Sequence, residues 1–159
     1  MEDLSILLKR LNDEGVDFVI IGGFAAVAYG ASTLTRDVDL CAALTRENVE
    51  RIRAALSGWN PRHRMTPARL SFLTHPSAGE DVKNLYLETD KGVVDILSSV
   101  IGVGDFERLR RAAEVVEIDG CEYRIMGLAD LIASKEALGR DKDLLAAREL
   151  RVIEEKRKS

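Results

Sequence analysis

The chain contains 159 residues, of which 46% are hydrophobic and 31% are charged, as in an ordinary globular protein with a single core. Its net charge of −4 argues against broad, non-specific binding of nucleic acid. No apolar run reaches the roughly 20 residues of a membrane span, and no export signal is recognisable. We therefore expect one cytoplasmic domain, residues 1–159, without membrane contact.

The N-terminal part of the chain alternates between helical and strand patterns. Leucines spaced three and four residues apart predict a first helix that ends near Gly15. An apolar run bounded by glycine is typical of a central strand that is covered on both faces. The next predicted elements are the strand Val16–Ile21, a short helix Phe24–Tyr29 closed by Gly30, the strand Asp37–Ala43 and a helix capped by Thr45.

The C-terminal part begins after a segment without periodicity. Prolines and glycines interrupt Ser57–Glu80, so we expect a basic loop there, with one irregular strand around Leu70–Leu73. Alternating polar and apolar residues predict hairpins further on. The predicted elements are hairpins of Val82–Glu88 with Val93–Ser98 and of Glu114–Ile118 with Cys121–Met126, and helices at Gly102–Arg111, Leu128–Leu138 and about Lys142–Lys156.

Two carboxylates share one face of the strand that begins at Asp37. Side chains alternate along a strand, so Asp37 and Asp39 point to one face while Val38 and Leu40 point to the other. Carboxylates about 6–7 Å apart repel each other unless a cation lies between them. Mg²⁺ binds one or two carboxylates and completes its coordination with water and phosphate oxygens. The pair indicates a magnesium site; the alternative is a solvated strand end.

A double glycine precedes this pair in the chain. Gly22 and Gly23 open a short helix, whose free backbone N–H groups and dipole can receive an anion. Glycine also lets a phosphate approach the backbone closely. The alternative is a plain turn from strand to helix. An anion site beside a metal site indicates a protein that handles nucleoside triphosphates.

A third carboxylate, Asp95, interrupts the apolar run of Val93–Leu97. A carboxylate inside such a strand is costly unless it is paired with a cation or bound to a metal. The alternative is an aspartate on an edge strand that faces water.

These motifs, in order and spacing, resemble the DNA-polymerase-β-like nucleotidyltransferase superfamily. More narrowly, the chain is similar to small bacterial nucleotidyltransferases related to the AbiEii-type toxins. The matching segments cover essentially the whole chain and are Gly22-Gly23, Thr35–Asp39, Gly92–Leu97 and Lys135–Asp143. The resemblance implies that Asp37 and Asp39 hold metal ions, and that Asp95 accepts the proton of the incoming hydroxyl.

The two C-terminal helices place further charges on their inward faces. Lys135 continues the apolar stripe that Leu128 begins, and Asp143 lies on the inward face of the last helix. The alternatives are a lysine that extends its stem to solvent and an aspartate that stabilises a helix N-terminus. The resemblance implies that Lys135 contacts the triphosphate, and that Arg140, Lys142 and Asp143 line the nucleotide side of the cleft.

The chain departs from the superfamily pattern at two positions. Phe24 stands where a serine or threonine usually binds phosphate, and Thr33 stands where closer relatives commonly have an arginine. Arg36 does not replace that arginine convincingly, because it points away from the side of Asp37. These departures favour a catalytically silent nucleotide-binding or antitoxin-like module, whereas three intact carboxylates favour an enzyme.

The expected architecture is an α/β (α+β) domain with a small mixed, mostly antiparallel sheet. We expect helices on one face, a metal cleft on the other, a core of about residues 1–126, and a C-terminal helical pair at about 127–157 that walls the cleft. The expected function is two-metal transfer of a nucleoside monophosphate from an NTP, with Mg²⁺ or Mn²⁺, to a hydroxyl of a tRNA end, a protein or a small molecule such as an aminoglycoside. In so short a chain, a homodimer or a partner protein is expected to complete the acceptor site. Two interpretations are open for the basic residues of the loop: they steer an RNA acceptor end, or they form a solvated lobe. These residues are Arg62, His63, Arg64 and Arg69.

Overall fold

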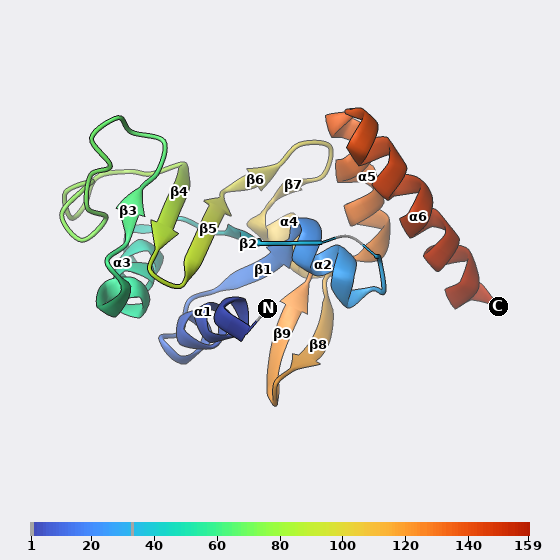
Figure 1. Cartoon of the computed structure of the whole chain (residues 1–159), viewed down its shortest axis with the longest axis horizontal. Coiled ribbons are helices and arrows are strands. Elements are labelled where there is room, and N and C mark those ends of the chain that lie inside the picture. Colours follow the sequence, from blue (N-terminus) through green and yellow to red (C-terminus); the bar gives the residue numbers. More distant parts are fainter. Residues whose placement is uncertain (1, 33) are drawn as a thin grey trace.

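The computed structural model describes residues 2–32 and 34–159, and its centre is a mixed sheet (Figure 1). The strands are β1 (Phe18–Ile21), β2 (Asp37–Ala42), β3 (Arg62–His63), β4 (Asn84–Thr89), β5 (Gly92–Leu97), β6 (Ser99–Val100), β7 (Gly104–Asp105), β8 (Glu114–Ile118) and β9 (Cys121–Ile125). Within the described residues, seven of them form one sheet in the order β3-β4-β5-β2-β1-β9-β8, and β6 pairs with β7. The pairs β1–β9 and β2–β5 are parallel, and the other neighbours are antiparallel. The mixed, mostly antiparallel sheet is therefore as the sequence predicts.

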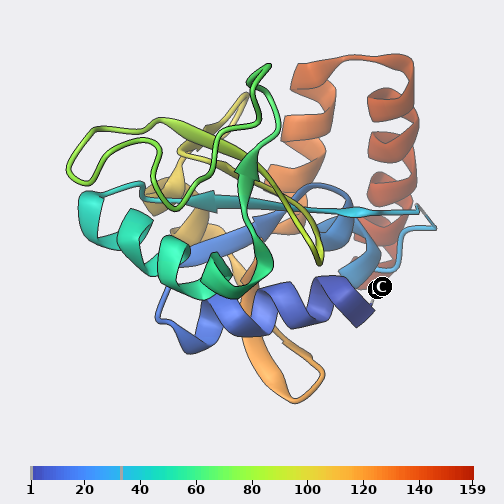
Figure 2. The same cartoon turned by 60° about the vertical axis from the view of Figure 1, so that its left-hand side comes forward.

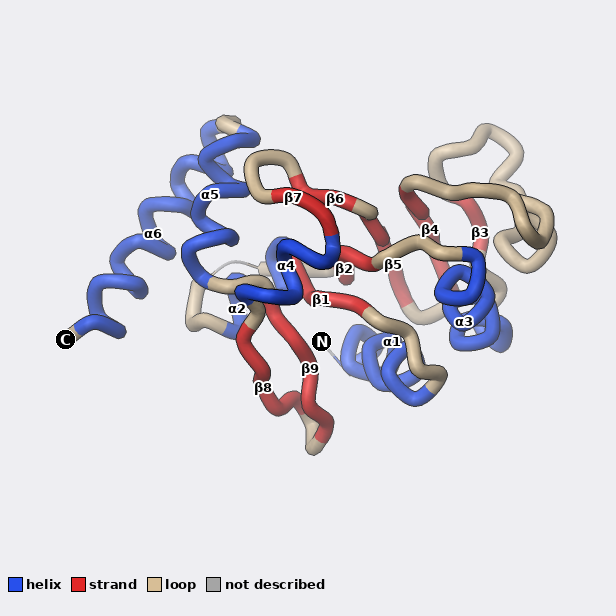
Figure 3. Tube along the Cα trace, turned by 180° about the vertical axis from the view of Figure 1, so that it is seen from behind, coloured by secondary structure: helices blue, strands red, loops and turns tan. Residues whose placement is uncertain are grey.

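The helices gather on two sides of the strands. They are α1 (Glu2–Asp13), α2 (Gly22–Ala28), α3 (Arg46–Leu56), α4 (Phe106–Ala112), α5 (Leu128–Leu138) and α6 (Asp141–Lys158). Figures 1 and 2 show α1 and α3 side by side on one side of the sheet, and the α5–α6 pair on the other. The view from behind shows α4 against β1 and β2 (Figure 3). Among the described helices, none combines the length and the apolar character that crossing a membrane requires.

Strand alternation divides the sheet into an apolar face and a polar face. Val38 and Leu40 of β2, and Val94 and Ile96 of β5, are fully buried, whereas Asp39 between them is only partly covered. The apolar face belongs to the core that the leucines of α1 and the inward residues of α3 complete. On β2 and β5 the apolar residues that flank the carboxylates thus lie in the core, and Asp39 and Asp95 point to the opposite face.

The predicted helices and strands are present except in two segments, and the two-residue strands β3 and β6 were not predicted from the sequence. The helix expected at Gly102–Arg111 begins only at Phe106, because the preceding residues form β7 and Asp105 caps the helix by accepting a hydrogen bond from the Arg108 N–H. The irregular strand expected at Leu70–Leu73 is reduced to an isolated bridge between Ser71 and Arg62. Both differences arise where short two-residue pairings decide the local structure, which sequence periodicity does not encode.

The long loop between β3 and β4 is anchored by a buried arginine. Arg53 of α3 is only 8% exposed, and its guanidinium donates hydrogen bonds to the backbone carbonyls of Phe72, His75 and Pro76. It also lies 4.6 Å from the centre of the Phe72 ring. One side chain thus satisfies several carbonyls that the loop's own backbone leaves without partners.

We expect Arg53→Met to lower the free energy of unfolding by about 2–3 kcal/mol, because the loop carbonyls lose a charged donor. Urea unfolding followed by circular dichroism measures the loss, and limited proteolysis should cut the loop sooner. Arg51→Met is the matched control, since Arg51 is exposed on the same helix. Equal stability of the two variants would contradict the anchoring role.

Candidate active site

The register of the sheet brings the three predicted carboxylates to one place. Asp39 of β2 pairs directly with Asp95 of β5, and Tyr86 of β4 pairs with Asp95 from the other side. Paired residues of neighbouring strands point to the same face, about 5 Å apart. Asp37 lies two residues before Asp39 and therefore on that face as well. The face carries Tyr86, Asp95, Asp39 and Ile21 in one row across four strands.

Gly22 makes room for the carboxylate of Asp39. Its φ of +66° lies in the left-handed region, and a Cβ built on it would stand 2.6 Å from Asp39 Oδ2. Gly23 is also confined, because a Cβ there would stand 3.2 Å from Thr35 Oγ1. The structure thus gives the double glycine a role that the sequence does not reveal: it lets Thr35, which precedes β2, and Asp39 of β2 approach the start of α2 closely.

The electrostatics of the carboxylates reflect burial and mutual repulsion. Burial raises the pKa of Asp39 to about 6, with further contributions from the charges of Asp95 and Asp37 and opposing ones from Lys135 and Arg64. Burial also raises the pKa of Asp95, although Arg64 opposes it. Carboxylates whose ionised form is disfavoured in this way are typical of functional sites.

Arg64, from the loop after β3, is paired with Asp95. Its Nε donates to Asp95 Oδ1 at 3.2 Å and its Nη2 donates to Oδ2, so both carboxylate oxygens are engaged. The guanidinium lies 5.7 Å from the centre of the Tyr86 ring. The side chain of Asp95 is 15% exposed and that of Arg64 is 29% exposed. The carboxylate is thus paired with a cation, one of the two conditions that its apolar strand requires.

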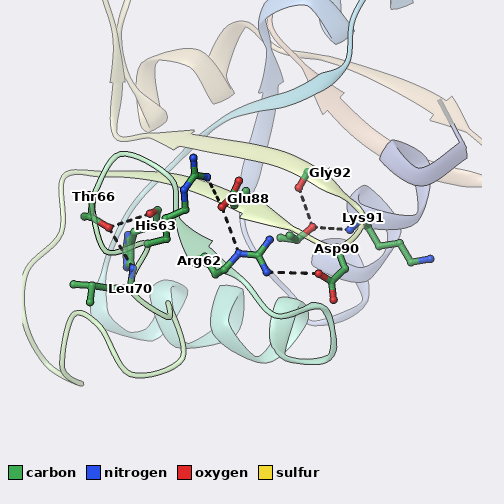
Figure 4. Close-up of polar contacts among 10 residues, drawn as sticks. Arg62, His63, Thr66, Leu70, Glu88, Asp90, Lys91 and Gly92 are labelled. Carbon is green, nitrogen blue, oxygen red and sulfur yellow. Dashed lines mark hydrogen bonds and ion pairs between the residues drawn. The ribbon is translucent and has the colours of Figure 1, made fainter.

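The other basic residues of β3 and the following loop are also paired with protein groups. Neither interpretation from the sequence, a surface that steers RNA or a solvated lobe, includes such pairing. Arg62 lies 3.4 Å from Glu88 and 3.7 Å from Asp90, and Figure 4 shows these contacts along β4. Arg69 also pairs with Glu88. His63 Nε2 lies 2.7 Å from the carbonyl oxygen of His75. The arginines hold the loop against the sheet rather than form a free basic surface.

The C-terminal helices bring a second group of charges to the site. Asp143 is 2% exposed, and Arg140 donates to both of its oxygens, which lowers the pKa of Asp143. Lys135 Nζ lies 3.9 Å from Asp143 Oδ1, with its side chain 19% exposed. Asp143 therefore holds two cations, of which Lys135 is close enough to Asp39 to oppose the rise of its pKa. Lys142 is exposed, and the structure does not bring it to this group.

A cavity of about 500 Å³ extends from Asp39 to the C-terminal helices. Its lining residues come from several elements, and they are Ile21, Gly22, Asp39, Lys83, Asn84, Tyr86, Leu97, Ser98, Ser99, Val100, Ile101, Met126, Ser134, Lys135, Leu138 and Arg140. This volume suits a small ligand, and the mixture of apolar walls with a few polar groups is usual for such sites. The predicted cleft walled by the C-terminal helices is thus present.

The donor set fits a hard divalent cation, although it is not assembled around one. Among the described residues, no group of three or more His, Cys, Asp and Glu side chains is already gathered as a metal site. Asp37, Asp39 and Asp95 nevertheless offer only oxygen donors on one face, which is the chemistry that Mg²⁺ or Mn²⁺ prefers. The three carboxylates, when ionised, carry one more charge than the two cations beside them, Lys135 and Arg64. The resulting net negative charge would attract a metal cation.

The two departures from the superfamily pattern have different outcomes. Phe24 is 4% exposed and belongs to the core, so its side chain does not contact the cavity. Thr33 lies outside the described residues. Arg36 is exposed.

Sequence reasoning missed the Arg64–Asp95 pair, because an irregular loop gives no periodicity from which contacts across 31 residues could be inferred.

Comparisons with known proteins agree with the geometry. Residues 1–52, which contain Gly22, Asp37 and Asp39, match the model of a family described as nucleotidyl transferase of unknown function (DUF2204). A search of curated proteins gave no match.

Three solved structures resemble nearly the whole chain. The lincosamide antibiotic adenylyltransferase LnuA, solved with lincomycin bound, has a TM-score of 0.64 at 12% identity, with 96% of each chain covered. A candidate nucleotidyltransferase from Thermotoga maritima, TM1012, has a TM-score of 0.56 at 18% identity, with 91% of this chain and 88% of that chain covered. The antibiotic-resistance factor ANT(2'')-Ia has a TM-score of 0.56 at 14% identity, with 96% and 87% covered. The narrower similarity to AbiEii-type toxins stays a prediction, whereas the chain has the fold of the nucleotidyltransferase superfamily.

Proposed function

We propose that the protein transfers a nucleoside monophosphate from an NTP to a hydroxyl group and releases pyrophosphate. The observation that carries this proposal is the pairing of Asp39 with Asp95 on adjacent strands, with Asp37 on the same face, beside a cavity of about 500 Å³. The proposed metal ligands are Asp37, Asp39 and Asp95, and the proposed ions are Mg²⁺ or Mn²⁺. Bound there, such ions would neutralise phosphate charge and polarise the reacting phosphoryl group.

The residues of the chain divide the remaining work. Asp95 is proposed to accept the proton of the attacking hydroxyl. The hydroxyl oxygen then forms a bond to the α-phosphorus, while the bond from that phosphorus to the bridging oxygen breaks and pyrophosphate leaves. Lys135 and Arg140 line the cavity and bind the triphosphate, and Asp143 holds both in place.

The proposed acceptor is a small molecule with a hydroxyl group. LnuA, which shares the fold, is named as an adenylyltransferase of a lincosamide antibiotic, and the cavity here has the volume of a small-molecule site.

The direct test is label transfer from the four α-³²P-labelled NTPs in the presence of Mg²⁺. Mixtures of small hydroxyl compounds, total tRNA and the protein alone provide the three acceptor classes in separate reactions. We expect label on a small compound with wild-type protein and none with Asp95→Asn. Label that appears only on tRNA or on the protein would overturn the acceptor proposal and leave the transferase proposal standing.

Lys135→Met is expected to raise the KM for the NTP about 10–100-fold, because a partly buried ammonium that faces the triphosphate is lost. Steady-state kinetics with the preferred NTP measure this change. Lys142→Met is the matched control, since Lys142 is exposed and is not placed among the cavity residues. A similar KM change in both variants would contradict the assignment.

A catalytically silent nucleotide-binding module is the second candidate, and the burial of Phe24 favours it. No side-chain hydroxyl follows the double glycine here, so phosphate contacts at that point rest on backbone N–H groups alone. NTP binding that depends on Mg²⁺, without label transfer to any acceptor class, would identify this case. A thermal-shift titration run beside the transfer assay separates the two candidates.

A further inference from the structure

The loop that carries Arg64 is built to hold this side chain over the carboxylates. The Arg64 backbone N–H donates to the Tyr86 carbonyl at 3.0 Å, and the neighbouring His63 N–H donates to the Leu70 carbonyl at 2.8 Å. Figure 4 shows the next layer of support, in which Thr66 bonds to His63 and Arg62 is paired along β4. The backbone at Arg64 is therefore fixed on both sides, so the side chain reaches Asp95 from a fixed starting point.

The guanidinium occupies the space in front of Asp95. Both oxygens of Asp95 accept hydrogen bonds from Arg64, while Asp37 and Asp39 have no such partner in the described part of the chain. Arg64 is still close enough to both for their charges to raise its pKa. One cation of the protein thus stands beside the third carboxylate, where the carboxylate would otherwise face a second metal ion.

An incoming triphosphate changes this balance. Its phosphate oxygens are strong acceptors for a guanidinium, and an arginine binds such groups with two parallel hydrogen bonds. The Arg64 side chain is 29% exposed, so it can turn from Asp95 to a phosphate without movement of the loop backbone.

We infer that Arg64 holds the place of the second divalent cation until a nucleotide binds. The inference rests on the proposed function, because it assumes that the three carboxylates bind divalent ions. In the free protein the site takes one ion, at Asp37 and Asp39. The second ion enters beside Asp95 only when the triphosphate has drawn Arg64 away.

The test counts Mn²⁺ ions bound to the full chain by the electron paramagnetic resonance of free Mn²⁺, without nucleotide and with α,β-methylene-ATP. Wild-type protein is expected to bind one ion without the analogue and two with it. Arg64→Gln is expected to bind the second ion without the analogue, with an affinity on the order of tenfold higher than in the wild type. Arg64→Lys, which keeps the charge but not the paired hydrogen bonds, should fall between them.

Two controls make the outcomes separable. Arg62→Gln removes an arginine of β3, two residues before Arg64, that pairs with Glu88 and Asp90 instead, and this variant should bind Mn²⁺ as the wild type does. Asp39→Asn should lose binding of the first ion. If Asp39→Asn loses Mn²⁺ but Arg64→Gln matches the wild type in number and affinity, the inference is wrong and the proposed metal site stands. If wild type, Arg64→Gln and Asp39→Asn all fail to bind Mn²⁺, the metal site itself is wrong, and the inference is overturned with it.

Discussion

Asp39→Asn is expected to lower the rate of nucleotidyl transfer on the order of 10³-fold and, at the same time, to stabilise the metal-free protein. The loss of rate follows from the loss of a proposed metal ligand. The gain in stability follows because burial and two neighbouring carboxylates disfavour ionised Asp39, whose pKa rises from 3.8 to about 6. With allowance for partial solvent screening, the expected gain at pH 7.5 is about 1–2 kcal/mol.

The gain must depend on pH in a defined direction. Between about pH 4 and pH 6 the folded wild type binds more protons at Asp39 than the unfolded chain does, so its free energy of unfolding falls as the pH rises. Above this window the cost of ionised Asp39 is fully present, and below it Asp39 is neutral in both states. Asp39→Asn should therefore be more stable than the wild type at pH 7.5 and equal to it near pH 3.5.

Urea unfolding in EDTA at several pH values measures this difference. Asp37→Asn is the matched control on the same strand: Asp37 is exposed and contributes less than burial or Asp95 to the raised pKa of Asp39, so a smaller gain is expected. Divalent ions should reverse the order, because they bind the wild type and raise its stability by mass action. An Asp39→Asn protein that is less stable than the wild type at pH 7.5 in EDTA would show that the carboxylate is structural.

The convergence of the carboxylates was only partly accessible from the sequence. Alternation along β2 puts Asp37 and Asp39 on one face, and the apolar neighbours of Asp95 mark a buried strand, whereas only the resemblance to the superfamily implied that this strand lies beside β2. The direct pairing of Asp39 with Asp95 is a matter of register, which alternation restricts but does not determine. The structure provides that last step.

The counter-ion of Asp95 was not accessible in this way. Arg64 belongs to a segment with prolines and glycines, where hydrogen bonds such as that from the Arg64 N–H to the Tyr86 carbonyl fix the chain, rather than a repeated pattern. The same holds for β3, which is two residues long. Sequence patterns thus identify the acids on regular strands, but not the bases that irregular loops bring to them.

Gly22→Ala is expected to reduce nucleotidyl transfer by about 10²-fold or more, although the substitution adds only one methyl group. That group would stand 2.6 Å from Asp39 Oδ2 and 3.0 Å from Asp39 Cβ, so the carboxylate has to move. A displacement of about 1 Å in a catalytic group is enough to cost 10²-fold in rate. The φ of +66° adds strain of about 1–2 kcal/mol to any residue with a side chain, which lowers stability as well.

Gly15→Ala separates the two effects. Gly15 has a φ of +75°, close to that of Gly22, but a Cβ there would meet no atom within 4 Å. Gly15→Ala should therefore lose only the free energy of unfolding that the left-handed φ costs. Gly22→Ala should lose at least as much, and it alone should lose transfer activity and Mn²⁺ affinity. If Gly22→Ala keeps both at wild-type levels, the carboxylate of Asp39 can work from another position, and the close approach over Gly22 is a feature of the fold alone. If it loses both while Gly15→Ala keeps both, the glycine positions the site.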